Sequence, residues 1–206
     1  MRSIGLFKRR RLALAAAIFT LAAVVAAPRP ALAEADRLDV VATTGMIADA
    51  ARQVGGDLVK VRALMGPGVD PHAYRQTRTD IAALARADLV LWHGLYLEAQ
   101  MEEFMHELSE NQTVVAVAET LPKELLLGHD EYDNKYDPHV WMDPERWSLV
   151  IKAVRDALIE QLPDEAATLN ANTERHLSEV AELADYADEV MASVPEQSRV
   201  LLTAHD

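Results

Sequence analysis

Two segments of the chain share the tripeptide Asp-Pro-His, at residues 70–72 and 137–139. Proline fixes its own backbone φ at about −65° and favours an extended conformation in the residue before it, so each histidine follows a stiff piece of backbone. A stiff backbone is useful where an imidazole must be held in one direction. We therefore interpret His72 and His139 as two ligands of one divalent metal ion; the alternative is two unrelated histidines in turns.

The remaining histidines differ in their surroundings. His205 ends an apolar run typical of a strand, and we take it as the third metal ligand. His93 also ends such a run, and we predict a structural or hydrogen-bonding role for it. His106 and His176 lie in helical stretches among charged residues and are predicted to be solvated. His129 lies in a polar loop, where a weak metal-recruiting role is the alternative to a plain loop histidine.

Three imidazoles favour a transition metal ion. Neutral imidazole suits zinc, and it suits manganese or iron when oxygen ligands complete the shell, at metal–nitrogen distances of about 2.0–2.2 Å. Three histidines and a water are also the arrangement of a zinc hydrolase, which needs a general base beside the metal. The sequence has no His-Glu-x-x-His motif, and we expect Asp70, Asp137 and Asp143 to act in turns and helix caps.

The elements that must position these histidines alternate between strand and helix. This order is typical of a parallel α/β sheet flanked by helices, in which ligands bind at the carboxyl ends of the strands. His72 follows the second predicted strand, His93 ends the third and His139 comes after the fourth. The predicted strands are 38–43, 58–65, 88–92 and 113–118, and the predicted helices are 46–54, 81–87 (capped by Thr79-Asp80), 97–108 and 144–161.

A long stretch without glycine or proline follows this lobe. Residues 163–195 are predicted to form one helix, whose roughly 30 residues would span about 45 Å. It lacks a sustained heptad pattern, so we interpret it as a bridge between two lobes. A further strand is predicted at 199–204. We divide the chain into an N-terminal metal-binding lobe (34–162), the inter-lobe helix (163–195) and the start of a truncated C-terminal lobe (196–206).

Residues 1–33 have the pattern of a secretory signal peptide. Basic residues come first, residues 12–27 form an uncharged apolar run, and Ala31-Leu32-Ala33 offers small side chains to a signal peptidase. We expect an exported periplasmic protein that is not inserted in the membrane after cleavage. Cysteine is absent, so we expect a fold held together by its core and no acylated cysteine.

The charge balance bears on possible partners. Of the 20 basic residues, six lie in residues 1–33, which leaves 14 against 33 acidic residues and a net charge of −19. Such an acidic surface argues against nucleic acid and anionic membranes as partners.

Four segments of the chain carry a family resemblance: residues 69–74, 94–98, 137–144 and 203–206. They resemble the TroA-like periplasmic metal-binding proteins of zinc, manganese and iron ABC importers. The resemblance implies two α/β lobes joined by a rigid helix, with the metal in the cleft between them. It implies that His72, His139 and His205 are ligands, that a fourth, carboxylate ligand comes from the C-terminal lobe, and that His93 replaces a common asparagine.

The resemblance also implies a function without catalysis. A monomeric binding protein of this kind captures a divalent transition metal ion and delivers it to a permease with its ATPase. The absence of a long histidine-rich loop favours manganese or iron, whereas histidine at position 205 favours zinc, so Zn²⁺, Mn²⁺ and Fe²⁺ stay open. The alternatives are the zinc hydrolase and a metal chaperone that acts without a permease.

Overall fold

The computed structural model describes residues 37–128 and 134–200. The chain divides into two units, Met1–Ala31 and Leu32–Asp206, and all the described residues belong to the second. The predicted signal peptide (1–33), the predicted third ligand His205 and the loop residue His129 therefore lie outside the described residues. In the part of the chain that is described, no helix is both long and apolar enough to cross a membrane.

Four parallel strands form the sheet in the order β2-β1-β3-β4, as the predicted α/β class requires. Val40 in the centre of β1 lies opposite Val61 on one side and Leu89 on the other. At the edge, β2 exposes Lys60 and Arg62, whose charges discourage pairing with another sheet. The strands are β1 (Leu38–Ala42), β2 (Val59–Ala63), β3 (Leu89–Trp92) and β4 (Val114–Ala116).

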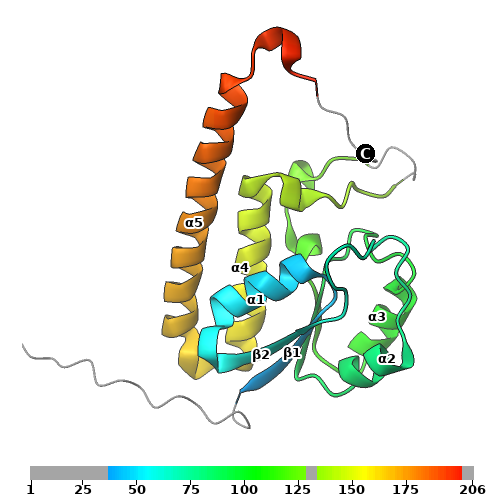
Figure 1. Cartoon of the computed structure of the whole chain (residues 1–206). Helices are drawn as coiled ribbons and strands as arrows, with labels where there is room; N and C mark the ends of the chain where they lie inside the picture. Colours follow the sequence, from blue (N-terminus) through cyan, green and yellow to red (C-terminus); the bar gives the residue numbers. More distant parts are fainter. Residues whose placement is uncertain (1–36, 129–133, 201–206) are drawn as a thin grey trace, which may run out of the picture. The chain divides into compact units, whose positions relative to one another are not determined.

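Helices cover both faces of the sheet (Figure 1). Because side chains alternate along a strand, Val40 and Ala42 pack under α1, α4 and α5, while Val41 packs in a second core with α2 and α3. The α-helices are α1 (Gly45–Gly55), α2 (Arg78–Leu84), α3 (Glu102–Ser109), α4 (Pro144–Gln161) and α5 (Ala166–Ser193), and the 3-10 turns are η2 (Gly56–Leu58), η3 (Val117–Thr120), η4 (Lys123–Leu125), η5 (Val140–Met142), η6 (Pro163–Glu165) and η7 (Glu196–Ser198).

Several element boundaries differ from the predicted ones. The predicted cap of α2 at residues 79–80 is wrong, because Thr77 is the N-cap and forms a reciprocal capping box with Asp80. The helix predicted from residue 97 begins only at Glu102, after a connection in which residues 94–96 all have positive φ. By contrast, α4 has its predicted bounds, with Pro144 in the first turn and Asp143 as its N-cap.

The long helix α5 has 28 residues and a length of about 42 Å. Its first half packs on α1 and α4, with Leu169 and Thr173 fully buried. Asn172 Nδ2 donates to Val54 O at 2.9 Å, so α5 also caps the end of α1. The second half is exposed, and its large apolar side chains face away from the core: Leu183, Tyr186, Val190 and Met191.

Two predictions for this region have different outcomes. His176 was expected to be solvated, which is wrong: it is only 9% exposed, because it lies on the packed face of α5, and its Nδ1 lies 3.4 Å from Glu179 Oε2. The strand predicted at 199–204 is not present at residues 199 and 200, and its remaining residues lie outside the described part of the chain.

Candidate metal centre

The structure brings His72 and His139 together. Their Nε2 atoms lie 3.3 Å apart and their ring centroids 5.4 Å apart, although 67 residues separate them in the chain. His72 lies in the connection after β2 and His139 in the connection after β4, at the carboxyl end of the parallel sheet. Within residues 37–128 and 134–200, no group of three or more potential metal-ligating His, Asp or Glu side chains is present.

The two Asp-Pro-His turns have the same local hydrogen bond. The backbone N–H of His72 donates to Asp70 Oδ1 at 2.9 Å, and that of His139 donates to Asp137 Oδ1 at 2.8 Å. An aspartate that accepts from the backbone two residues later forms an Asx turn, a compact and rigid conformation. The prediction that these carboxylates act in turns is confirmed.

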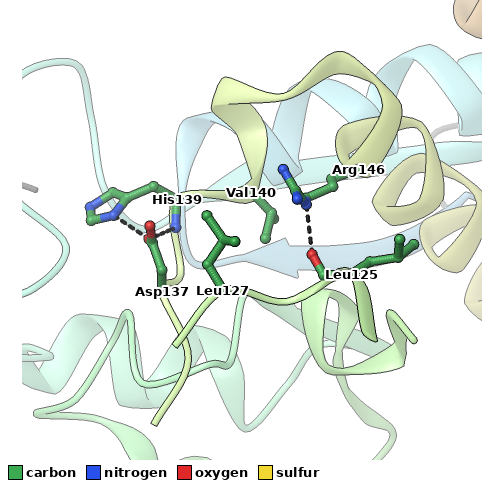
Figure 2. A pocket seen from close by; sticks show the side chains of 6 residues that line it. All are labelled: Leu125, Leu127, Asp137, His139, Val140 and Arg146. Atoms are coloured by element: carbon green, nitrogen blue, oxygen red, sulfur yellow. Dashed lines mark hydrogen bonds and ion pairs between the residues drawn. The ribbon is translucent and has the colours of Figure 1, made fainter. Parts of the chain in front are cut away.

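Asp137 has a second role that the sequence analysis missed. Its Oδ1 also lies 2.6 Å from His139 Nδ1 (Figure 2). A carboxylate can only accept, so His139 Nδ1 carries a proton; in the neutral ring Nε2 then has the lone pair, and it lies on the side of His72. Such a carboxylate partner fixes the orientation of an imidazole that binds a metal. An aspartate two residues before a candidate ligand is the sequence signal that could have identified it.

A small cavity lies behind His139 (Figure 2). Its volume is about 30 Å³, which is enough for a water molecule. Arg146 closes the side opposite His139: its Nε donates to Leu125 O at 2.7 Å and its Nη1 pairs with Asp143. Asp143 in turn accepts from the backbone N–H of Glu145, as expected of a helix cap. The lining residues are Leu125, Leu127, Asp137, His139, Val140 and Arg146.

The connection that carries His72 is fastened to α2 through Asp80. Oδ2 of this buried carboxylate accepts from Tyr74 Oη at 2.7 Å and from Thr77 Oγ1 at 2.6 Å, and Oδ1 pairs with Arg62 at 3.5 Å. Burial alone would raise the pKa of Asp80, but the hydrogen bonds from Thr77 and Tyr74 outweigh it and leave the pKa below its ordinary value. Burial and the bond to Asp80 raise the pKa of Tyr74 to about 12.

His93 lies fully buried beneath the second turn, with its Nε2 2.7 Å from Pro138 O. Burial lowers the pKa of His93 to about 4, so the ring is neutral. A carbonyl oxygen only accepts, so Nε2 carries the proton and donates it to Pro138. The predicted hydrogen-bonding role of His93 is confirmed by this contact. Its Nδ1 is buried without a hydrogen-bond partner among the described residues.

The buried carboxylate of Glu98 accepts hydrogen bonds from the backbone at His93. Glu98 accepts from the backbone N–H of His93 at 2.9 Å, from that of Gly94 at 3.2 Å and from Thr43 Oγ1 at 2.6 Å. Burial raises the pKa of Glu98, although these three donors favour the ionised form. They come from the ends of β1 and β3, so Glu98 joins the two central strands at the edge that bears the histidines.

His106 was the other histidine predicted to be solvated. It is exposed on α3, as predicted for a solvated histidine, and its ring contacts Trp92 edge-on at 5.7 Å. Of the three predicted ligands, the described residues thus include the pair His72 and His139.

Comparison with known proteins identifies the family of this chain. A family model described as zinc-uptake complex component A, periplasmic (ZnuA), matches residues 40–206. The chain is 39% identical to the manganese-binding lipoprotein MntA of Bacillus subtilis over 170 residues, which cover 82% of this chain and 55% of MntA. It is 41% identical to the zinc-binding protein TroA of Treponema pallidum over 167 residues, covering 81% of this chain and 54% of TroA.

A third relative and one solved structure agree with this result. The iron-binding protein YfeA of Yersinia pestis is 32% identical over 197 residues, covering 92% of this chain and 63% of YfeA. The solved structure of Treponema pallidum TroA matches with a TM-score of 0.79 at 40% identity, covering 82% of this chain and 61% of the TroA chain. The chain therefore spans 54–63% of the length of the three curated relatives. By its sequence and its fold, the chain belongs to the ZnuA family of periplasmic zinc-uptake components.

Proposed function

We propose that this chain captures a divalent transition metal ion and delivers it to an ABC importer, without catalysing a reaction. The observation that carries the proposal is the pair of Nε2 atoms 3.3 Å apart, each on a rigid Asx turn. The relatives support it, since their names describe manganese-, zinc- and iron-binding proteins. The carboxylates of Asp70, Asp137 and Asp143 are engaged in turns and a helix cap, which does not favour the alternative of a hydrolase.

The spacing of the two imidazoles fits one shared ion. If both Nε2 atoms lay about 2.0–2.1 Å from the metal, a separation of 3.3 Å would give a nitrogen–metal–nitrogen angle of about 104–111°. This is close to the tetrahedral angle that zinc adopts. An octahedral ion at about 2.1–2.2 Å would need the two nitrogens only about 0.2–0.3 Å closer. Zn²⁺, Mn²⁺ and Fe²⁺ are therefore all proposed as candidate ions.

Two ligands do not complete a metal shell, so the proposal includes further ones. We propose His205 as the third ligand and a carboxylate from a second lobe as the fourth. The described chain offers a place where such a lobe could attach, since the second half of α5 exposes Leu183, Tyr186, Val190 and Met191. In this arrangement residues 34–162 form the first lobe, 163–195 the inter-lobe helix and 196–206 the start of the second.

The site of action and the partners follow from the same proposal. We propose that residues 1–33 direct export and that the protein acts in the periplasm as a monomer, where it meets a permease and its ATPase. Some relatives are named lipoproteins, and the solved TroA structure is named a periplasmic zinc-binding protein, which supports a role outside the cytoplasm.

A metal-affinity titration with matched histidine variants tests this function. Zinc and manganese affinities would be measured by competition with a chromophoric chelator, for the full chain and for His72→Ala, His139→Ala and the control His106→Ala. Removing a residue that only supports a metal ligand typically weakens metal binding about 10- to 100-fold. His72→Ala and His139→Ala should weaken it by more than that, because each removes a proposed ligand. The control should bind like the unaltered protein. Equal affinities for all four proteins would contradict the proposal.

A further inference from the structure

The backbone of His93 is held in place on both sides. Its N–H donates to the buried carboxylate of Glu98 at 2.9 Å, and its C=O accepts from Ala118 N at 3.0 Å. Both partners are buried, and His93 itself is 0% exposed at the end of β3. The imidazole therefore starts from a backbone position whose N–H and C=O are both hydrogen-bonded to buried partners.

From this position the His93 ring reaches the turn that carries His139 in two ways. Its Nε2–H donates at 2.7 Å to the carbonyl of Pro138, the residue directly before His139. The same carbonyl accepts from Val140 N at 2.7 Å, so both of its lone pairs are used. The His93 ring also meets Trp141 edge-on, with centroids 5.4 Å apart at an interplanar angle of 84°.

Trp141 transmits this contact to the candidate ligand itself. Its ring lies 5.2 Å from the His139 ring at an angle of 68°. The indole thus contacts both histidine rings, and His93 contacts both the main chain before His139 and the aromatic side chain that packs against the His139 ring. Asp137 then sets the rotation of the imidazole through Nδ1.

We propose that His93 is a positioning residue for His139: through Pro138 and Trp141 it holds the second imidazole at its distance from His72, while taking no place in the metal shell. This inference rests on the proposed function for its consequence, the metal affinity. Its structural part, the placement of the His139 ring, holds for the metal-free protein as well.

The alternative is that His93 only fills space in the core, and substitutions separate the two roles. His93→Gln keeps an N–H donor, because its amide nitrogen is the same number of bonds from Cα as Nε2 of histidine. His93→Leu and His93→Met fill the site without a donor, and methionine adapts to irregular space if leucine does not fold. His176→Leu is the matched control, since it removes another buried imidazole, on α5.

The first measurement is the ¹H–¹⁵N spectrum of the imidazoles in the metal-free full chain. In the unaltered protein and in His93→Gln, His139 should show one tautomer with the proton on Nδ1. In His93→Leu and His93→Met, the His139 signals should shift towards an average of both tautomers, because the ring loses its fixed place. Unchanged His139 signals in the leucine and methionine variants, or signals of His93→Gln that match theirs, would overturn the proposal.

The second measurement is zinc affinity by chelator competition. His93→Leu and His93→Met should bind about 10- to 100-fold more weakly, the effect typical of a residue that orients a ligand. His93→Gln should bind within a few-fold of the unaltered protein, and His176→Leu should bind equally well. Affinities in the leucine and methionine variants equal to that of the unaltered protein would overturn the positioning role. If the unaltered protein bound none of Zn²⁺, Mn²⁺ and Fe²⁺, the proposed function would be overturned instead, and the tautomer of His139 would then decide the inference alone.

Discussion

The buried neutral His93 should make the folded protein sensitive to acid. Its pKa is lowered from 6.5 to about 4 by burial, whereas in the unfolded chain the ring is expected to titrate near its ordinary value. Between these values the unfolded state binds more protons than the folded state, so the free energy of unfolding falls as the pH is lowered. Stability from this group is fully present above about pH 6.5 and is lost as the pH falls towards about 4.

The size of this loss of stability follows from the lowered pKa of His93. The contribution of His93 to the free energy of unfolding should fall by about 2 kcal/mol between pH 7 and pH 5, and by about 3 kcal/mol by pH 4. Small domains are stable by about 5–15 kcal/mol, so one histidine could account for a large part of acid unfolding.

Urea unfolding of metal-free protein at pH 7 and pH 5 measures this effect, with a chelator present because bound metal would add stability. Other groups also titrate, so the informative quantity is the difference between two proteins. The unaltered chain should lose about 2 kcal/mol more than His93→Gln, which has no titrating ring. The exposed His106→Gln should lose as much as the unaltered chain. An equal loss in the unaltered chain and in His93→Gln would refute the reasoning.

Three further predictions concern the same edge of the sheet. Tyr74→Phe removes the hydroxyl that donates to Asp80 and should lower the free energy of unfolding by about 1 kcal/mol in urea titrations, whereas an unchanged midpoint would show that this bond contributes nothing. Gly94→Ala should cost at least about 1 kcal/mol in the same assay, because φ is 79° there and a Cβ would lie 2.8 Å from Glu119 Cγ; full stability would contradict this. Metal affinity should fall below about pH 6.5, because imidazoles must be deprotonated to bind, and competition titrations that give one affinity between pH 5 and 8 would argue against histidine ligands.

Much of the fold could be predicted because local pattern and topology agree. The apolar runs that became β1 and β3 are buried on both faces, as a parallel sheet between two helical layers requires. Pro144 and Asp143 stand in the usual places for the start of a helix, so α4 has its predicted bounds. The meeting of His72 and His139 followed from repeated turns at the same edge of that sheet.

The error at the start of α3 occurred where tertiary contacts outweigh local preference. Leu95 and Tyr96 adopt positive φ, which their types disfavour, and α3 therefore starts later than predicted. The connection is held by Glu98, which accepts from two backbone N–H groups, and by Glu119, which accepts from Leu95 N at 3.3 Å. Nothing in the local sequence shows that a glutamate will be buried for this purpose.

The error at His176 has a related cause. A histidine among charged residues of a long helix resembles an exposed one, and only the packing of α5 on α1 and α4 decides which face is buried. The contact between Asp137 and His139 Nδ1 was missed because the same aspartate already explains the turn. The position of Asp137 two residues before a candidate ligand was the signal for its second role.

The most direct test of the central claim, that His72 and His139 hold one metal ion together, is X-ray absorption at the zinc edge of the protein loaded with one equivalent of zinc. We predict nitrogen ligands at about 2.0–2.1 Å with the outer-shell scattering of at least two imidazoles, reduced by one imidazole in His72→Ala and by one in His139→Ala. A spectrum without imidazole scattering, or one that neither substitution changes, would contradict the claim.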